Sequence, residues 1–135
     1  MEIQLIKADT ADCFKSSELM MRASESSKSL KTKHYRVIAD CGEVAFVSLD
    51  RWPEPEISRM VIYEIFVLRN MRRKGIGTAL LTEIEKVAMQ EGFRKTYLRP
   101  STLDCTFSQT DMVNWYLCKG YNFDLAMTGS MQKQL

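Results

Sequence analysis

Five short stretches of the chain are rich in apolar, β-branched or aromatic residues, a pattern typical of β-strands. They are residues 2–8, 35–39, 44–49, 60–68 and 95–99. Because only a short polar turn separates the second stretch from the third, these two predict a β-hairpin. The prolines that follow Trp52 cannot donate to a strand ladder, so a loop is expected before the fourth stretch. That stretch contains a single charged residue and predicts a mostly buried strand.

The strongest helical pattern runs from Gly75 to Gln90, where apolar residues recur along one face and charged residues occupy the others. Gly92 then fits the left-handed cap position at which many helices end. A weaker helical spacing covers residues 11–22. A further helix is expected to begin at Thr110 or Asp111, whose side chains can cap a first turn. The pattern therefore predicts three helices.

Residues 121–135 predict one or two further short strands. The middle of the chain is ordered strand, helix, strand, which implies a parallel crossover, whereas the preceding hairpin is antiparallel. The expected fold class is therefore α/β in the α+β sense, with a mixed sheet. Since 135 residues can enclose one apolar core, a single domain over residues 1–135 is expected.

Composition narrows the class of protein. The sequence is 45% hydrophobic and 27% charged, which is too apolar for a disordered chain. No apolar run approaches ~20 residues, so no membrane span is expected, and the first residues lack the pattern of a signal peptide. We therefore expect a soluble, cytoplasmic protein. A net charge of +2 implies no general affinity for nucleic acid or anionic lipid, so neither is expected as a partner.

The cysteines and the single histidine argue against two kinds of site. Four cysteines stand far apart without a C-x-x-C pair and are expected to be free thiols: Cys13, Cys41, Cys105 and Cys118. With His34 as the only histidine, a zinc site of usual spacing is not expected, and no metal is predicted. Hydrolysis by a Cys–His or Ser–His pair is disfavoured for the same reason. The position of His34 just before a predicted strand indicates a surface residue.

A basic, glycine-containing turn joins the central strand to the longest helix: Arg72-Arg73-Lys74-Gly75-Ile76-Gly77. The first turn of a helix carries unpaired N–H groups and the positive end of the helix dipole, which favour a phosphate. Gly75 and Gly77 remove two Cβ atoms where an anion would approach. Taken alone, the turn could also be an ordinary helix entry. It is neither a P-loop nor a dinucleotide fingerprint, because Leu80 stands at the third glycine position of the latter.

The complete turn resembles the Q/R-x-x-G-x-G/A acetyl-CoA signature of the GNAT superfamily of N-acetyltransferases, and like that signature it stands between an apolar strand and an amphipathic helix. Farther along, Trp115-Tyr116-Leu117-Cys118-Lys119-Gly120-Tyr121 resembles the second signature of that family, an aromatic-Tyr-x-x-x-Gly-Phe/Tyr helix end. The resemblance spans residues 35–123. It implies a GNAT-like mixed, mostly antiparallel central sheet with a β-α-β acetyl-CoA-binding core and flanking helices.

The same resemblance implies how acetyl-CoA would be bound. The backbone N–H groups from Arg73 through Thr78 would cradle the pyrophosphate, with Arg72 at the head of the signature. The central strand would pair through its backbone with the pantetheine arm, in a V-shaped slot beside the strand at Lys95–Arg99. The implied cofactor-binding residues are Ile65, Phe66, Val67, Arg72, Arg73, Lys74, Gly75, Ile76, Gly77 and Thr78.

Acetyl transfer to an amine needs a neutral amine, support for the developing oxyanion and a proton for the departing thiolate. The resemblance implies that Tyr116 supplies this proton as general acid, although a helix tyrosine can also simply pack its ring. Glu64 is the only carboxylate in the central strand, where a charge is costly unless it is used or paired. It is the candidate catalytic base, or a group that holds a cationic substrate, with direct proton loss to bulk water as the alternative. By alternation Glu64 faces the same way as Phe66 and Tyr63 faces the opposite way, and a one-residue bulge would swap them.

Two positions depart from the family pattern. Gln109 stands where many members carry an asparagine, and the loop Pro100–Ser108 is longer than usual, which puts a cofactor contact there in doubt. Arg69 replaces the proline often found before the first signature, and either meets a phosphate or faces solvent. Trp52 and the prolines after it would line the acceptor site or cover an edge of the core.

The leading hypothesis is an acetyl-CoA-dependent N-acetyltransferase, an acyltransferase that acts on a primary amine of a small molecule or a protein. Few residues stand between the first two strands to enclose an acceptor, which favours an open groove or one completed by a second subunit of a homodimer. A different class of function is a non-catalytic acyl-CoA-binding sensor or regulatory module. A toxin of the same superfamily that acetylates charged tRNA has little support from the near-neutral net charge.

Overall fold

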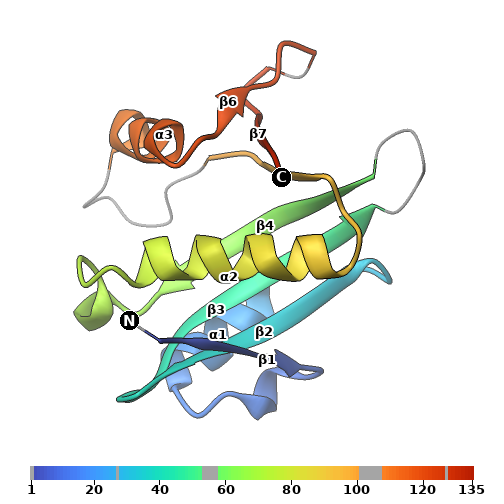
Figure 1. Cartoon of the computed structure of the whole chain (residues 1–135). Helices are drawn as coiled ribbons and strands as arrows, with labels where there is room; N and C mark the ends of the chain where they lie inside the picture. Colours follow the sequence, from blue (N-terminus) through green and yellow to red (C-terminus); the bar gives the residue numbers. More distant parts are fainter. Residues whose placement is uncertain (1, 27, 53–57, 101–107, 127) are drawn as a thin grey trace.

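The computed structural model describes residues 2–26, 28–52, 58–100, 108–126 and 128–135. Within these ranges, seven strands form one sheet in the spatial order β1 (Gln4–Ala8), β2 (Thr32–Ala39), β3 (Gly42–Trp52), β4 (Arg59–Val67), β5 (Lys95–Leu98), β7 (Met131–Gln134) and β6 (Asn122–Phe123). Neighbouring strands are antiparallel except β4 and β5, which are parallel. The mixed, mostly antiparallel sheet predicted from the sequence is confirmed (Figure 1).

The helical elements of the described ranges are η1 (Ala11–Cys13), α1 (Ser17–Glu25), η2 (Arg69–Met71), α2 (Ile76–Gln90) and α3 (Gln109–Cys118). Helix α2 lies across one face of the sheet and α1 lies against the opposite face (Figure 1). Side chains of α2 and α3 belong to one apolar cluster, whereas α1 packs in a second, smaller cluster around Phe46. The two faces of the sheet therefore have separate cores.

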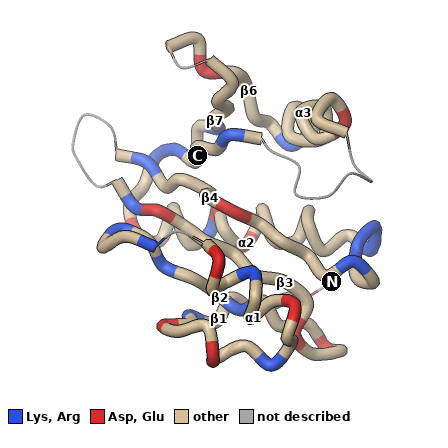
Figure 2. The backbone as a smooth tube through the Cα atoms, turned by 180° about the vertical axis from the view of Figure 1, so that it is seen from behind, with Lys and Arg blue, Asp and Glu red and all other residues tan. Residues whose placement is uncertain are grey.

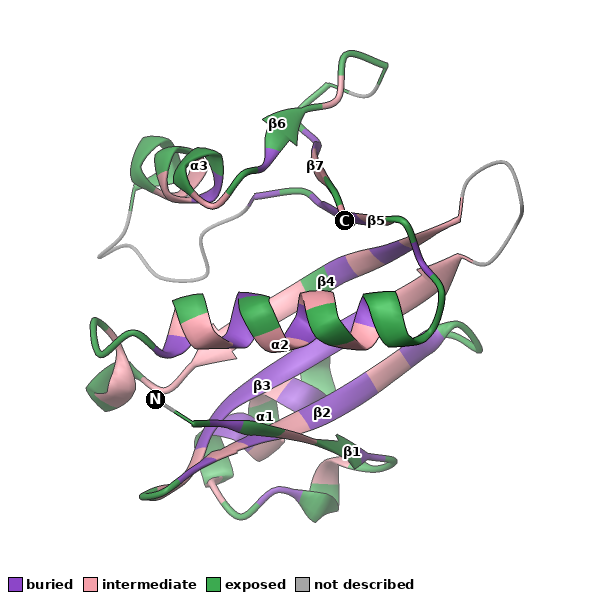
Figure 3. Cartoon of the chain, in the orientation of Figure 1, coloured by how far each residue is buried: buried purple, intermediate pink, exposed green. Residues whose placement is uncertain are grey.

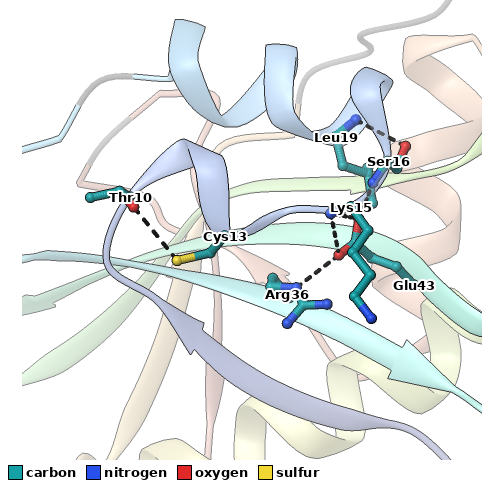
Figure 4. Close-up of polar contacts among 7 residues, drawn as sticks. All are labelled: Thr10, Cys13, Lys15, Ser16, Leu19, Arg36 and Glu43. Atoms are coloured by element: carbon teal, nitrogen blue, oxygen red, sulfur yellow. Dashed lines mark hydrogen bonds and ion pairs between the residues drawn. The ribbon is translucent and has the colours of Figure 1, made fainter.

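Helix α1 begins later than the sequence pattern indicates, because Ser16 caps it by accepting the N–H of Leu19. Hydrogen bonds to the carboxylate of Glu43 also stabilise the start of α1 (Figure 4). This carboxylate accepts the backbone N–H groups of Lys15 at 3.1 Å and Ser16 at 2.8 Å. It also accepts the Nε–H of Arg36 at 2.8 Å. Desolvation alone would raise the pKa of Glu43, but these hydrogen bonds outweigh it and hold the pKa below its usual value.

Helix α3 begins at Gln109, ahead of the expected caps. Ser108 is the N-cap, and its hydroxyl accepts the N–H of Asp111 at 3.0 Å. Thr110 and Asp111 consequently lie inside the first turn rather than before it. Ser108 is not among the expected caps, but its hydroxyl can cap a first turn in the same way as the side chains of Thr110 and Asp111.

Strand β3 is the most deeply buried, with both of its faces covered along Val44–Leu49 (Figure 3). His34 of the neighbouring β2 is only 6% exposed, and its ring packs edge-on against Phe46 with 4.9 Å between centroids. The expectation of a surface histidine is therefore wrong. The strand begins at Thr32, two residues before His34, and α1 covers the face on which His34 lies.

None of the helices in the described ranges has the length and apolar character needed to cross a bilayer. Three cysteines are free, exposed thiols: Cys13, Cys41 and Cys118. The prolines after Trp52, most of the loop before Ser108 and Cys105 lie outside the described residues.

Candidate active site

The turn before α2 leaves the start of the helix open. Gly75 is the N-cap residue and lies in the left-handed region at φ +81°, and Arg73 also has a positive φ of 62°. The first N–H bonded within the helix is that of Ala79, which donates to the carbonyl of Gly75 at 3.1 Å. The N–H groups of Ile76–Thr78 precede it and have no carbonyl of the helix to bond. Such N–H groups at the positive end of a helix dipole form an anion-binding site.

The three basic side chains of this turn differ in their surroundings. Arg73 and Lys74 are exposed, and they place positive charge beside the start of α2 because they directly precede its N-cap, Gly75. Figure 2 shows basic positions gathered at this end of the helix. Arg72 is half-buried, and its Nε–H donates to the carbonyl of Val67 at 2.9 Å. Its guanidinium also lies 5.3 Å from the ring centroid of Phe66. Arg72 therefore fastens the turn to the end of β4.

Glycine is favoured at the two positions of the turn for different structural reasons. At Gly75 a Cβ would meet nothing within 4 Å, and glycine is favoured there by the positive φ. At Gly77 a Cβ would lie 3.3 Å from Cζ2 of Trp115 in α3. The sequence pattern attributes both glycines to the approach of an anion, whereas Gly77 also allows α3 to pack against α2.

Strand β4 extends beyond the end of β5. Their parallel pairing covers only Met60–Ile62 against Thr96–Leu98 (Figure 3). The following residues, Tyr63–Val67, pair with β3 along their other edge, and no strand of the described residues pairs with them on the β5 side. Backbone groups on this edge need partners. The three residues expected to contact the pantetheine arm all fall in this stretch: Ile65, Phe66 and Val67.

A β-bulge interrupts β4 at Tyr63, because Ser48 of β3 faces Glu64 while the next residue of β3 faces Ile62. Tyr63 is the extra residue and is 50% exposed. The bulge turns Glu64 away from the face on which Ile62 is buried beneath α2. Since the bulge precedes both Glu64 and Phe66, these two share a face, as alternation indicates. That face is covered by α1.

Glu64 is paired with Arg22 of α1. The Nε–H of Arg22 donates to Oε2 of Glu64, and Nη1 lies 3.5 Å from a carboxylate oxygen of Glu25. The Glu64 side chain is 8% exposed and that of Arg22 28%. The hydrogen bond to Glu64 raises the pKa of the Arg22 guanidinium, which stays charged. The sequence pattern contains no signal for this partner, which is 42 residues away along the chain.

Tyr116 lies in the opposite core, in the same apolar cluster as α2. It is 8% exposed, and its ring makes edge-on contacts with Trp115 at 4.9 Å and Tyr121 at 5.5 Å between centroids. Desolvation raises the pKa of Tyr116 to about 12, so the phenol keeps its proton at neutral pH. The structure therefore places Tyr116 and Glu64 on opposite faces of the sheet.

A partly buried polar network lies beside the end of α3. The hydroxyl of Tyr121 lies 2.8 Å from Oγ1 of Thr96 and donates to Glu85 of α2 at 3.2 Å. Glu85 also accepts from Lys133 of β7 at 2.9 Å. This network joins α2, β5 and β7 behind Tyr116. No local sequence pattern indicates it, because its members are spread over separate parts of the chain.

The side chain of Gln109, the residue that departs from the family pattern, makes a hydrogen bond within the protein. Its Nε2 donates to the carbonyl of Pro100 at 2.8 Å, which ties the start of α3 to the segment just after β5. Gln109 thus connects the two ends of the long loop.

A cavity of about 240 Å³ opens between α1 and the end of β4. Its lining combines side chains of α1, among them Arg22, with Phe66 of β4 and two arginines of the following turn, Arg69 and Arg72. The cavity lies on the Glu64 side of the sheet, since Phe66 and Glu64 share a face. Within the described ranges, no three His, Cys, Asp or Glu side chains gather as a metal site requires.

The chain matches the model of the acetyltransferase (GNAT) family over residues 8–121. No protein of curated function matches it by sequence.

Among solved structures, the chain resembles the PaiA N-acetyltransferase of Thermoplasma acidophilum in complex with coenzyme A, at 15% identity and a TM-score of 0.64, over 100% of both chains. It also resembles a GNAT family acetyltransferase of Elizabethkingia anophelis with acetyl-CoA bound, at 14% identity and a TM-score of 0.64, over 98% of both chains. A third similar structure is an acetyltransferase of Thermus thermophilus, at 11% identity and a TM-score of 0.67, covering 100% of this chain and 98% of that one. At these identities the likeness shows the shared fold.

Proposed function

Since the chain belongs to the acetyltransferase (GNAT) family, we propose that it binds acetyl-CoA along the unpaired edge of β4 and transfers the acetyl group to a primary amine. One observation carries the proposal: a single turn, residues 68–75, joins the open start of α2 to the part of β4 that lacks a partner strand on the β5 side among the described residues. The bond from Arg72 to the carbonyl of Val67 holds these two features together.

The residues present fit the two polar parts of coenzyme A. The N–H groups of Ile76–Thr78 would bind the pyrophosphate, and the side chains of Arg73 and Lys74 would add positive charge. The backbone of Ile65–Val67 would hydrogen-bond the pantetheine amides as a strand would. The complexes of the Thermoplasma and Elizabethkingia proteins with coenzyme A and acetyl-CoA support this assignment.

Tyr116 is the proposed general acid. Its phenol is protonated at neutral pH, because burial raises its pKa to about 12, and it lies in the same apolar cluster as Ile65 and Val67. It can therefore donate a proton to the coenzyme A sulfur as the thioester breaks. Its contacts with Trp115 and Tyr121 limit the orientations of the ring.

Glu64 is the proposed proton acceptor for the amine. Its carboxylate lies on the face of the sheet opposite Tyr116, and Arg22 orients it. An amine that approaches from the α1 side would reach Glu64, while the thioester would be held from the α2 side. The cavity beside Phe66 is the proposed acceptor entrance, on the same face as Glu64.

Two measurements on the purified chain test this function. Calorimetry with coenzyme A and with acetyl-CoA should detect binding, and release of free thiol should depend on both acetyl-CoA and a primary amine from a panel of small amines and lysine peptides. Binding without turnover on any amine, unchanged by Tyr116→Phe, would favour a non-catalytic acyl-CoA sensor. Absence of binding heat with either compound would remove the proposal altogether.

A further inference from the structure

Three polar side chains lie in a row beneath α1, on three adjacent strands. In the antiparallel register, His34 of β2 faces Ser48 of β3, and Ser48 faces Glu64 of β4. Directly opposite residues point to the same face, with Cβ atoms about 4.5–5.5 Å apart. His34, Ser48 and Glu64 therefore form a continuous polar row across the sheet.

The row is buried against an apolar cluster. Ser48 is 0% exposed, and its neighbour on the same face of β3, Phe46, packs with Phe14 and with His34. Among the described residues, the Ser48 hydroxyl has no hydrogen-bond partner. Leaving a buried hydroxyl unpaired is unfavourable, and an alanine or valine in this strand would avoid that cost. Packing alone therefore does not explain a serine at this position.

The bulge in β4 gives the row its third member. Without the extra residue at Tyr63, the side chain at position 64 would share the face of Ile62 under α2. With it, Glu64 faces the same side as Ser48 and meets Arg22 of α1. One end of the row is thus the proposed proton acceptor of the reaction, and the other is the only imidazole of the chain.

We propose that Ser48 and His34 carry the acceptor proton away from Glu64, an inference that rests on the proposed function. The ammonium N–H bond breaks as an O–H bond forms on Glu64, which leaves the amine its lone pair. Glu64 then passes a proton to the Ser48 oxygen, and the hydroxyl proton of Ser48 moves to a ring nitrogen of His34. Each transfer runs through a bridging water, because the Ser48 hydroxyl makes no direct hydrogen bond to either neighbour. The imidazolium later returns this proton to solvent. Arg22 keeps the carboxylate aligned with the row.

A first experiment tests the row without any turnover. Because the chain has one histidine, the ¹⁵N resonances of its imidazole are assigned without ambiguity. At neutral pH, Glu64→Gln and Ser48→Ala should each shift them, while Thr32→Val should not. Thr32 is a matched control, a buried hydroxyl on the same strand as His34, bonded to Asp50 and outside the row. Resonances that are the same in Glu64→Gln and Ser48→Ala as in the wild type would overturn the proposal.

A second experiment tests the proton path in catalysis, with the amine that gives the fastest thiol release in the panel. Ser48→Ala should lower kcat about tenfold with an unchanged KM for acetyl-CoA. In a Glu64→Gln background the same substitution should cost nothing further, because the path is already broken. A loss of equal size in both backgrounds would mean that Ser48 acts structurally, and would refute the proton path. If the wild type neither binds acetyl-CoA nor turns over, the proposed function fails, while the imidazole resonances still decide whether the row is coupled.

Discussion

A Cβ atom at Gly77 would lie 3.3 Å from Cζ2 of Trp115, so the second glycine of the basic turn sets how closely α3 approaches α2. Trp115 in turn packs edge-on against Tyr116, with 4.9 Å between ring centroids. A residue of the proposed phosphate site is therefore in contact with the helix that carries the proposed general acid. The two halves of the family pattern, 38 positions apart, meet at this contact.

Gly77→Ala should destabilise the protein, although alanine favours a helix. The helix propensity gained is at most about 1 kcal/mol, whereas overpacking against Trp115 costs about 1–3 kcal/mol. Urea unfolding should therefore show a lower stability, together with a lower kcat because Tyr116 is displaced. Trp115→Phe in the same chain should relieve the clash. A clear gain of stability in Gly77→Ala, with full activity, would mean that the Trp115 ring moves aside without an energetic cost.

Thr78→Pro should weaken coenzyme A binding. It deletes one N–H group of the helix start without removing a bond inside the helix, since Ala79 is the first residue bonded there. A lost hydrogen bond to a phosphate is worth about 1.5–3 kcal/mol, so Kd should rise roughly 10- to 100-fold by calorimetry.

The matched control for this variant is Thr78→Ala, which removes the exposed side chain and keeps the N–H group. Its Kd should stay within about a factor of two of the wild type. Equal affinities for the proline and alanine variants would show that the phosphate is bound elsewhere.

Tyr116→Phe should lower kcat about 100-fold or more and leave the Kd of acetyl-CoA unchanged, because it removes only the proton donor. Burial raises the pKa of Tyr116 to about 12, so the phenol does not ionise between neutral pH and about pH 10. The wild-type kcat should therefore not decline from this cause over that range. A Tyr116→Phe variant that retains the wild-type kcat would leave Tyr116 with a packing role only.

Much of the fold could be predicted from sequence because its signals are local. The hairpin of β2 and β3, the helix α2 and the crossover to β5 all follow from apolar patterning and turn residues, and the structure confirms them. The basic turn could be located for the same reason, since its glycines and basic residues lie within one short segment.

What the sequence did not reveal depends on pairing across the sheet. His34 is expected at the surface from its place before a strand, yet the row it forms with Ser48 is set by register. The partner of Glu64 comes from α1, and the bulge that orients Glu64 depends on a single unmatched residue of β4. Neither has a local pattern, because both arise when distant segments meet.

The stability of α1 should depend on pH through Glu43. Hydrogen bonds from Ser16, Lys15 and Arg36 hold the pKa of this carboxyl below its usual value of about 4.3, despite the opposing effect of desolvation. A depressed pKa contributes stability that is fully present above the pKa of the unfolded state and is lost as the pH falls through the pKa of the folded state.

Urea unfolding should therefore show Glu43→Gln to be less stable than the wild type by about 1–3 kcal/mol at neutral pH. That difference should shrink steadily below about pH 4. Glu18→Gln, an exposed glutamate of α1, is the matched control and should show little change. A Glu43→Gln deficit that stays constant down to about pH 3 would mean that the glutamine loses packing rather than charge.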